Sequence, residues 1–216
     1  MTLSPTSQKW AAILLAATAS VVAFAQAKLP ADIDPQSHAR LPYLTKSDAN
    51  KGKVWDIFGK SGTLSGPLAF AAYNPAVAQA LLDLHDASIG GTLDARTREL
   101  SILVACRETN YNLEWNGHLA AAKRAGVDDK LIDVIKTNGA LTGLDEKDAT
   151  VLRFGRQLYR DKKVDSATFA KVVQFWTKRG AMDMVAVMNT YAVSGFFAVA
   201  VDEHSPEGTA ELPALK

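Results

Sequence analysis

Apolar side chains recur every three or four residues through most of this chain, which is the period of one face of an α-helix. A clear case begins at Asn74-Pro75, a capping residue followed by proline in the first turn, and ends at Gly90-Gly91. No segment alternates strictly between apolar and polar residues over the length of a strand. The pattern therefore predicts an all-α domain.

Capping residues and glycines give the approximate bounds of each expected helix. The Ser194-Gly195 pair in the last expected helix would allow another element to approach closely. The expected helices cover residues 47–58, 75–89, 94–107, 111–125, 128–138, 145–162, 166–179 and 182–201.

The two ends of the chain differ from this helical middle. Lys9, an apolar run to Phe24 and Ala25-Gln26-Ala27 predict a signal peptide over residues 1–27 that is removed, which places the mature protein in the periplasm or outside the cell. An uncleaved membrane anchor is the alternative. Residues 28–46 contain three prolines and predict an extended arm, of the kind that often lies on a neighbouring subunit. Residues 47–203 are then one helical domain, and residues 204–216 a frayed tail.

Charge and cysteine content exclude two classes of function. The formal net charge of the 216-residue chain is +1 and becomes about zero without Lys9, so nothing favours binding to nucleic acid. Cys106 is the single cysteine, which excludes an internal disulfide and an intramolecular dithiol redox cycle.

The apolar segment 184–201 is long enough to raise the alternative of a membrane span. Polar residues from Asn189 to Ser194 interrupt it, and Asp183 and Asp202 bracket it. We therefore favour a helix buried on all sides, in the core or between subunits, and expect no membrane segment in the mature protein.

Two glutamates, a tyrosine and a histidine fall within one short helical block. Tyr111, Glu114 and His118 are spaced to share one helix face, and Glu99 lies on the preceding expected helix. If the two helices form an antiparallel hairpin around residues 108–110, these side chains can enter one groove. A carboxylate near an imidazole can then hold its tautomer and raise its pKa, which is the arrangement of a proton relay.

Two simpler interpretations of these residues stay open, and a separate expectation concerns Cys106. Glu114 and His118 can be an exposed ion pair, with Glu99 in a surface network with Arg96 or Arg98. Glu99, Glu114 and His118 can ligate a metal, although no second histidine lies nearby, and we expect neither metal nor cofactor. Cys106 follows four apolar or small residues and is expected to be a buried, inert thiol. The other histidines, His38, His85 and His204, are interpreted as structural or solvent-facing.

Four short motifs mark this block: Arg98-Glu99-Leu100, Glu114-Trp115-x-x-His118, Ala120-Ala121-Ala122 and Ala125-Gly126-Val127. With them the block resembles the carboxymuconolactone decarboxylase family, which also contains the alkylhydroperoxidase D-like proteins. The resemblance implies an all-helical alkylhydroperoxidase D-like bundle, here with an extended N-terminal arm, that assembles into homotrimers or homohexamers. It also implies a site in a groove between helices.

The same resemblance shows one departure. In the peroxidase branch a glutamate precedes a Cys-x-x-Cys pair, and a histidine follows four residues after the second cysteine. Glu99 and His118 match these two residues, whereas Tyr111 and Glu114 stand in the cysteine positions. Neither can perform two-electron sulfur chemistry, so peroxiredoxin activity is expected only if Cys106 substitutes with an outside reductant.

The resemblance therefore implies a decarboxylase-like lyase acting on a small substrate, a lactone or a carboxylic acid, by acid–base chemistry. In this hypothesis His118 shuttles the proton, and Glu114 orients the His118 ring. Glu99 is a second acid, and Tyr111 donates a hydrogen bond to the substrate. The alternatives are a thiol peroxidase that uses Cys106 and a non-catalytic protein that binds a small molecule.

Overall fold

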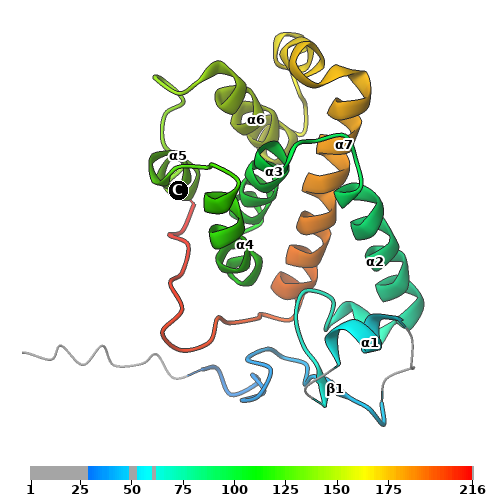
Figure 1. Ribbon diagram of the computed structural model, residues 1–216. Helices are drawn as coiled ribbons and strands as arrows, with labels where there is room; N and C mark the ends of the chain where they lie inside the picture. The colour runs from blue at the N-terminus through cyan, green and yellow to red at the C-terminus, as the bar shows by residue number, and fades with distance from the viewer. Residues whose placement is uncertain (1–28, 49–52, 60–61, 216) are drawn as a thin grey trace, which may run out of the picture. The chain divides into compact units, whose positions relative to one another are not determined.

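The computed structural model describes residues 29–48, 53–59 and 62–215, and these residues form an all-helical fold with two short strands (Figure 1). The all-α prediction is confirmed, while the expected signal peptide at residues 1–27 lies outside the described residues. The elements are β1 (Leu44–Thr45), α1 (Lys53–Phe58), β2 (Thr63–Leu64), η1 (Ala71–Tyr73), α2 (Pro75–Ile89), α3 (Ala95–Glu108), α4 (Asn112–Arg124), α5 (Asp129–Lys136), α6 (Glu146–Arg156), the π-helical turn η2 (Gln157–Asp161) and α7 (Ser166–Ala200).

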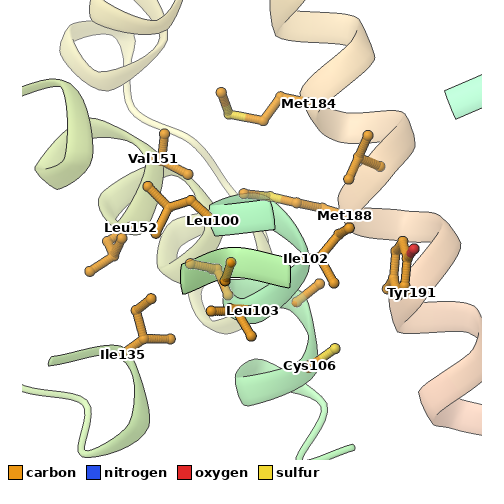
Figure 2. Close-up of a cluster of buried hydrophobic side chains, with 14 of the residues drawn as sticks. Leu100, Ile102, Leu103, Cys106, Ile135, Val151, Leu152, Met184, Met188 and Tyr191 are labelled. Atoms are coloured by element: carbon orange, nitrogen blue, oxygen red, sulfur yellow. The ribbon is translucent and has the colours of Figure 1, made fainter. Parts of the chain in front are cut away.

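Helix α3 is the centre of the domain, and α4, α5, α6 and α7 pack around it. Every residue from Glu99 to Arg107 is buried, so this helix has no solvent-facing side. Its leucines and isoleucine lie between α7 on one side and α5 and α6 on the other (Figure 2). Because Leu100 and residues 102–106 are apolar or small and point to every side of α3, the other helices can bury their own apolar stripes against it.

The predicted helix starts are confirmed at four positions. The side chain of Asn74 accepts a hydrogen bond from the backbone N–H of Val77 at 3.3 Å, and Asp94 accepts one from Thr97 at 2.9 Å. Asp128 and Asp145 cap α5 and α6 in the same way. Each cap satisfies an N–H group that has no partner inside its helix.

The first expected helix is shorter than predicted. Ser47 lies in a turn, and the Asp48 carboxylate accepts hydrogen bonds from the backbone N–H and the hydroxyl of Thr45. Asp48 therefore stabilises a turn and does not lie in a helix, and α1 covers Lys53–Phe58 among the described residues. The two-residue strands β1 and β2, which pair antiparallel on either side of α1, were not predicted.

The two last expected helices are joined into α7, and the break lies at Thr177 instead of at Gly180. Thr177 has φ 66° and ψ 174°, outside the helical region. Its hydroxyl accepts a hydrogen bond from the N–H of Gly180 at 3.4 Å. Thr177 therefore acts as the N-cap of the second half of α7, a role that suits threonine.

Helix α7 is long and apolar enough to cross a membrane by length and composition, but half of its most apolar window is buried inside the protein. Within a single chain the helix is not buried on all sides, because Met182, Phe196 and Val199 are more than half exposed. Burial of this face between subunits stays a prediction. Its opposite face carries buried polar residues such as Asp183, which accepts hydrogen bonds from the N–H and hydroxyl of Thr92 at 2.8 and 2.6 Å.

The N-terminal arm folds onto its own chain. The N–H of Arg40 donates to the carbonyl of Val201 at 2.7 Å, and the N–H of His204 donates to the carbonyl of His38 at 2.8 Å. Ala39, between them, is completely buried. The arm thus pairs with the segment that follows α7, because its backbone groups find partners there.

The C-terminal tail is docked, and the prediction of a frayed end is wrong for most of it. Leu212 is 6% exposed and belongs to the main core, and its N–H donates to the Asn112 side chain at 2.7 Å. The buried Arg107 donates to the carbonyl of Pro213 at 2.6 Å. Leu212, the Arg107 guanidinium and the Asn116 amide, which donates to the carbonyl of Ala210 at 3.0 Å, thus hold a segment whose composition resembles a free end.

Gly195 and Gly117 give a matched test of this packing. A Cβ at Gly195 on α7 would lie 2.8 Å from the Thr109 Oγ1 and 3.1 Å from the Tyr111 Cβ, whereas nothing lies within 4 Å of one at Gly117. Gly195→Ala should lower the free energy of unfolding by about 1–3 kcal/mol through overpacking. Gly117→Ala should raise it by roughly 0.5–1 kcal/mol, because alanine has the higher helix propensity. Urea unfolding measures both, and equal effects would contradict the close approach of α7.

Candidate active site

Glu99, Glu114 and His118 meet in the hairpin formed by α3 and α4. The Nδ1 of His118 lies 2.9 Å from the Oε2 of Glu99, and its Nε2 lies 3.4 Å from the Oε2 of Glu114. The two glutamate side chains are each 12% exposed and the histidine side chain is 22% exposed. The expected convergence is therefore present, and the alternative of an exposed surface pair is wrong.

The hairpin positions these groups through its turn. Asn110 has φ 53°, and the N–H of Tyr111 donates to the carbonyl of Cys106 at 2.8 Å, which reverses the chain within a few residues. Helix α4 then runs back along α3, so that a residue near the start of α3 faces one in the middle of α4. Arg96, which the alternative paired with Glu99, instead forms a bidentate pair with Asp148 on α6.

The two carboxylates keep the imidazole of His118 charged. Burial lowers the pKa of His118, but the hydrogen bonds and the charges of Glu114 and Glu99 outweigh it and raise this pKa to about 9. At neutral pH the ring is therefore an imidazolium with a carboxylate on each nitrogen. Both nitrogens are occupied, so His118 has no free lone pair to offer a metal ion.

A cavity of about 400 Å³ opens beside His118 and Glu114. Its walls come from α2, α7 and the chain on either side of β2, and they are mainly apolar. Glu99 does not line this cavity and contacts the Nδ1 of His118 instead. The lining residues are Phe58, Pro67, Leu68, Leu81, Leu82, His85, Glu114, His118, Thr190, Tyr191 and Ser194.

Two aromatic residues of this cavity were not predicted as site residues. The ring of Tyr191 meets the His118 ring edge-on, with centroids 4.9 Å apart and an interplanar angle of 88°. His85 lies 6.2 Å from the same tyrosine ring and lines the cavity, while its side chain is 42% exposed, as the solvent-facing interpretation expects. His85 follows Leu81 and Leu82 at helical spacing, a signal that places it on the inward face of α2.

Tyr111 does not join the other three side chains. It precedes α4 as the N-cap residue, with φ −90° and ψ 90°, and therefore lies outside the helical stripe that Glu114 and His118 share. Burial raises the pKa of its phenol, which stays protonated. It lines a different cavity, together with Tyr43 and Glu203.

Cys106 is inaccessible, as expected. Its side chain is completely buried, and burial followed by the charges of Glu114 and Glu99 raises the pKa of its thiol well above the ordinary value. A buried, protonated thiol is a poor nucleophile. In the part of the chain that the structure describes, no three His, Cys, Asp or Glu side chains are arranged to hold a metal ion.

Three solved structures have a similar fold. A protein from Ralstonia eutropha JMP134, described as an alkylhydroperoxidase AhpD core and an uncharacterized peroxidase-related protein, is 20% identical with a TM-score of 0.61, covering 79% of this chain and 93% of that one. A peroxidase-related protein from Silicibacter sp. TM1040 is 16% identical with a TM-score of 0.61, covering 82% and 95%. The debrominase Bmp8, crystallised as a cysteine-to-alanine variant with 2,3,4-tribromopyrrole, is 14% identical with a TM-score of 0.59, covering 76% and 90%.

These likenesses define the class of the fold as alkylhydroperoxidase D-like. The model of the carboxymuconolactone decarboxylase family matches residues 75–156, from the start of α2 to the end of α6. Residues 75–156 therefore resemble this family, and the resemblance predicted from the sequence is confirmed. A search of curated proteins finds no match.

The charge state of His118 gives a pH-dependent stability. Because its pKa is about 9 in the folded protein against an ordinary 6.5, its contribution is fully present below pH 6.5 and is lost as the pH rises through 9. The pKa difference corresponds to about 3 kcal/mol at most. Urea unfolding from pH 6.5 to 10 should therefore show the wild type losing stability relative to His118→Gln.

The same group can be observed directly. The ring proton of His118 should titrate near pH 9 in NMR spectra, and Glu99→Gln should lower that pKa because it removes one carboxylate. A ring that titrates near 6.5 in the wild type would contradict the carboxylate pairing.

Proposed function

We propose that this protein is an acid–base enzyme that transfers a proton to or from carbon in a small carbonyl compound, as a decarboxylase-like lyase would. One observation carries the proposal: the chain of Glu99, His118 and Glu114 runs from a buried carboxylate to the wall of a mainly apolar cavity. The family match supports an activity of the kind that the family contains, without naming a substrate.

The proton-transfer step uses Glu114 and His118 together. The Glu114 carboxylate takes a proton from a carbon next to the substrate carbonyl, and the electron pair of the C–H bond moves to the carbonyl oxygen. The imidazolium of His118 stabilises the resulting enolate by donating from Nε2. In a decarboxylation the same enolate forms when the C–C bond to a departing carbon dioxide breaks, and the carbon then takes a proton from the site.

Glu99 acts through His118. It is buried behind the imidazole, 2.9 Å from Nδ1, and does not line the cavity. We therefore assign it as a positioning residue, whereas the sequence hypothesis made it a second acid and made Glu114 the orienting residue. Glu114 is the carboxylate that faces the cavity, which suits it to proton exchange.

The cavity wall favours a neutral substrate. Among the described residues that line it, none is lysine or arginine, and most are aliphatic or aromatic. A lactone or another uncharged carbonyl compound fits this surface. A carboxylate group of a substrate would have to lie against the imidazoles of His118 and His85, the two basic groups of the lining. His85 lies across Tyr191 from His118 and is therefore the side chain placed to distinguish a neutral substrate from one with a carboxylate.

The two alternatives have less support. A thiol peroxidase mechanism requires peroxide to reach Cys106, which is completely buried and does not line the cavity. A non-catalytic binding protein needs the apolar cavity but has no use for an imidazolium held between two buried carboxylates, a costly arrangement to keep.

Cellular location and assembly are further proposals. Export rests on residues 9–27 alone. A trimer or hexamer rests on the family resemblance, and the exposed apolar face of α7 suits contact with another copy.

The acid–base proposal is tested by hydrogen exchange at carbon. A panel of small lactones and ketones is incubated with the protein in D₂O, and loss of the α-proton signal is followed by NMR. Glu114→Gln and His118→Gln should slow an active compound by roughly 10²–10⁴-fold, because each removes a proton-transfer partner. Glu99→Gln should shift the pH dependence of the exchange rate to lower pH, because it lowers the pKa of His118. Binding without exchange by any compound that stabilises the protein would instead support the non-catalytic alternative.

Cys106→Ser is the matched control for thiol chemistry. The substitution should leave exchange unchanged, since the thiol is buried and protonated. Consumption of hydroperoxide by the wild type that disappears in this variant would place the thiol in the mechanism and remove the acid–base assignment.

A further inference from the structure

A second cavity lies beside the start of α4, between the N-terminal arm and the segment that follows α7. It has a volume of about 180 Å³, which is enough for a small molecule. We call it the Tyr111–Glu203 cavity. Its lining residues are Gln36, Ser37, His38, Tyr43, Tyr111, Leu113, Glu203, His204, Ser205 and Pro206.

Several polar groups in this lining lack partners among the described residues. Tyr111 is 4% exposed, yet its hydroxyl makes no hydrogen bond to a described residue, and neither does the half-buried Glu203 carboxyl. The Ser205 hydroxyl and the His204 Nε2 are buried without a hydrogen bond, the latter 3.5 Å from Asp202. Buried polar groups are nearly always hydrogen-bonded, so the Ser205 hydroxyl and the His204 Nε2 indicate a place where something binds. The Tyr111 hydroxyl and the Glu203 carboxyl are not fully buried, and their residues line the cavity.

The chemistry of the lining selects the kind of ligand. One carboxyl and two tyrosine rings face the cavity, and none of its lining residues is lysine or arginine. Tyr43 is held in place by stacking on Phe70, with ring centroids 5.9 Å apart. A carboxylate with aromatic rings around it is the arrangement that recognises alkylammonium groups. The charge of Glu114, which acts on Glu203, also opposes an anion here.

We propose that the Tyr111–Glu203 cavity binds a small organic cation of the alkylammonium type, with Glu203 as its counter-ion and Tyr43 and Tyr111 as its aromatic walls. This site is separate from the cavity beside His118 and does not depend on the proposed reaction.

The protonation of Glu203 supports this assignment. Burial, and then the charge of Glu114, raises its pKa to about 7, so an unliganded carboxyl is partly neutral at physiological pH. A bound cation stabilises the ionised form. The cation therefore displaces the proton, and affinity should rise about tenfold between pH 6 and pH 8 through the titration of this group. His38, His204 and the two tyrosines are the other titratable groups that face it.

Choline and 3,3-dimethylbutan-1-ol test the proposal, because they have the same shape and differ in charge. Each is titrated into the purified protein by calorimetry at pH 8, with sodium chloride keeping the ionic strength constant. Choline should bind saturably and the neutral alcohol at least tenfold more weakly. No saturable choline binding, or equal binding of the alcohol, overturns the proposal.

Variants locate the binding. Glu203→Gln should weaken choline binding at least tenfold, whereas Glu207→Gln, which removes the same charge from an exposed position of the same segment, should not. Tyr111→Phe keeps the ring and should keep binding, while Tyr111→Leu should lose most of it. These tyrosine variants test the site even if Glu203→Gln folds poorly, and unchanged affinity in both Glu203→Gln and Tyr111→Leu would overturn it.

Discussion

The burial of α3 on every side is the constraint on which the rest of this structure depends. A helix without a solvent-facing side must be surrounded, and α4, α5, α6 and α7 each cover part of it. The same burial forces any polar side chain on α3 to find a partner inside the protein. Glu99 meets this requirement through His118, so the central packing helix also fixes the candidate catalytic imidazole.

His118 in turn connects the core to the cavity. One nitrogen faces the buried carboxylate and the other faces the carboxylate at the cavity wall. Removing either glutamate changes the charge of the ring, and removing the ring leaves two buried carboxylates without their cation. Stability and chemistry at this point are therefore properties of the three side chains together and are not additive.

The helix starts could be predicted from the sequence, because they depend on interactions between residues that are close together in the chain. Asn74, Asp94, Asp128 and Asp145 cap their helices because each bond spans two or three residues. The hairpin and its spacing then brought Glu99, Glu114 and His118 within reach.

The features that the sequence did not predict depend on contacts between distant segments. The arm pairs with residues after α7, and the tail is held by Leu212 and Arg107, which are about one hundred residues apart. His85 faces the cavity only because α2 packs on α7. Contrary to the prediction, Tyr111 does not share a helix face with Glu114 and His118, because it lies just before α4 and a residue outside a helix does not follow the helical period.

The cavity beside His118 is built from two parts of the chain with different relations to the family. Glu114 and His118 lie inside the matched region 75–156, whereas Phe58, Pro67 and Leu68 lie before it and Tyr191 lies after it. The proposed acid–base groups thus come from the hairpin inside the matched region, while much of the surface that a substrate would contact comes from flanking segments. Such a division lets the flanking segments diverge, and with them the choice of substrate, while the proton-transfer groups stay in place.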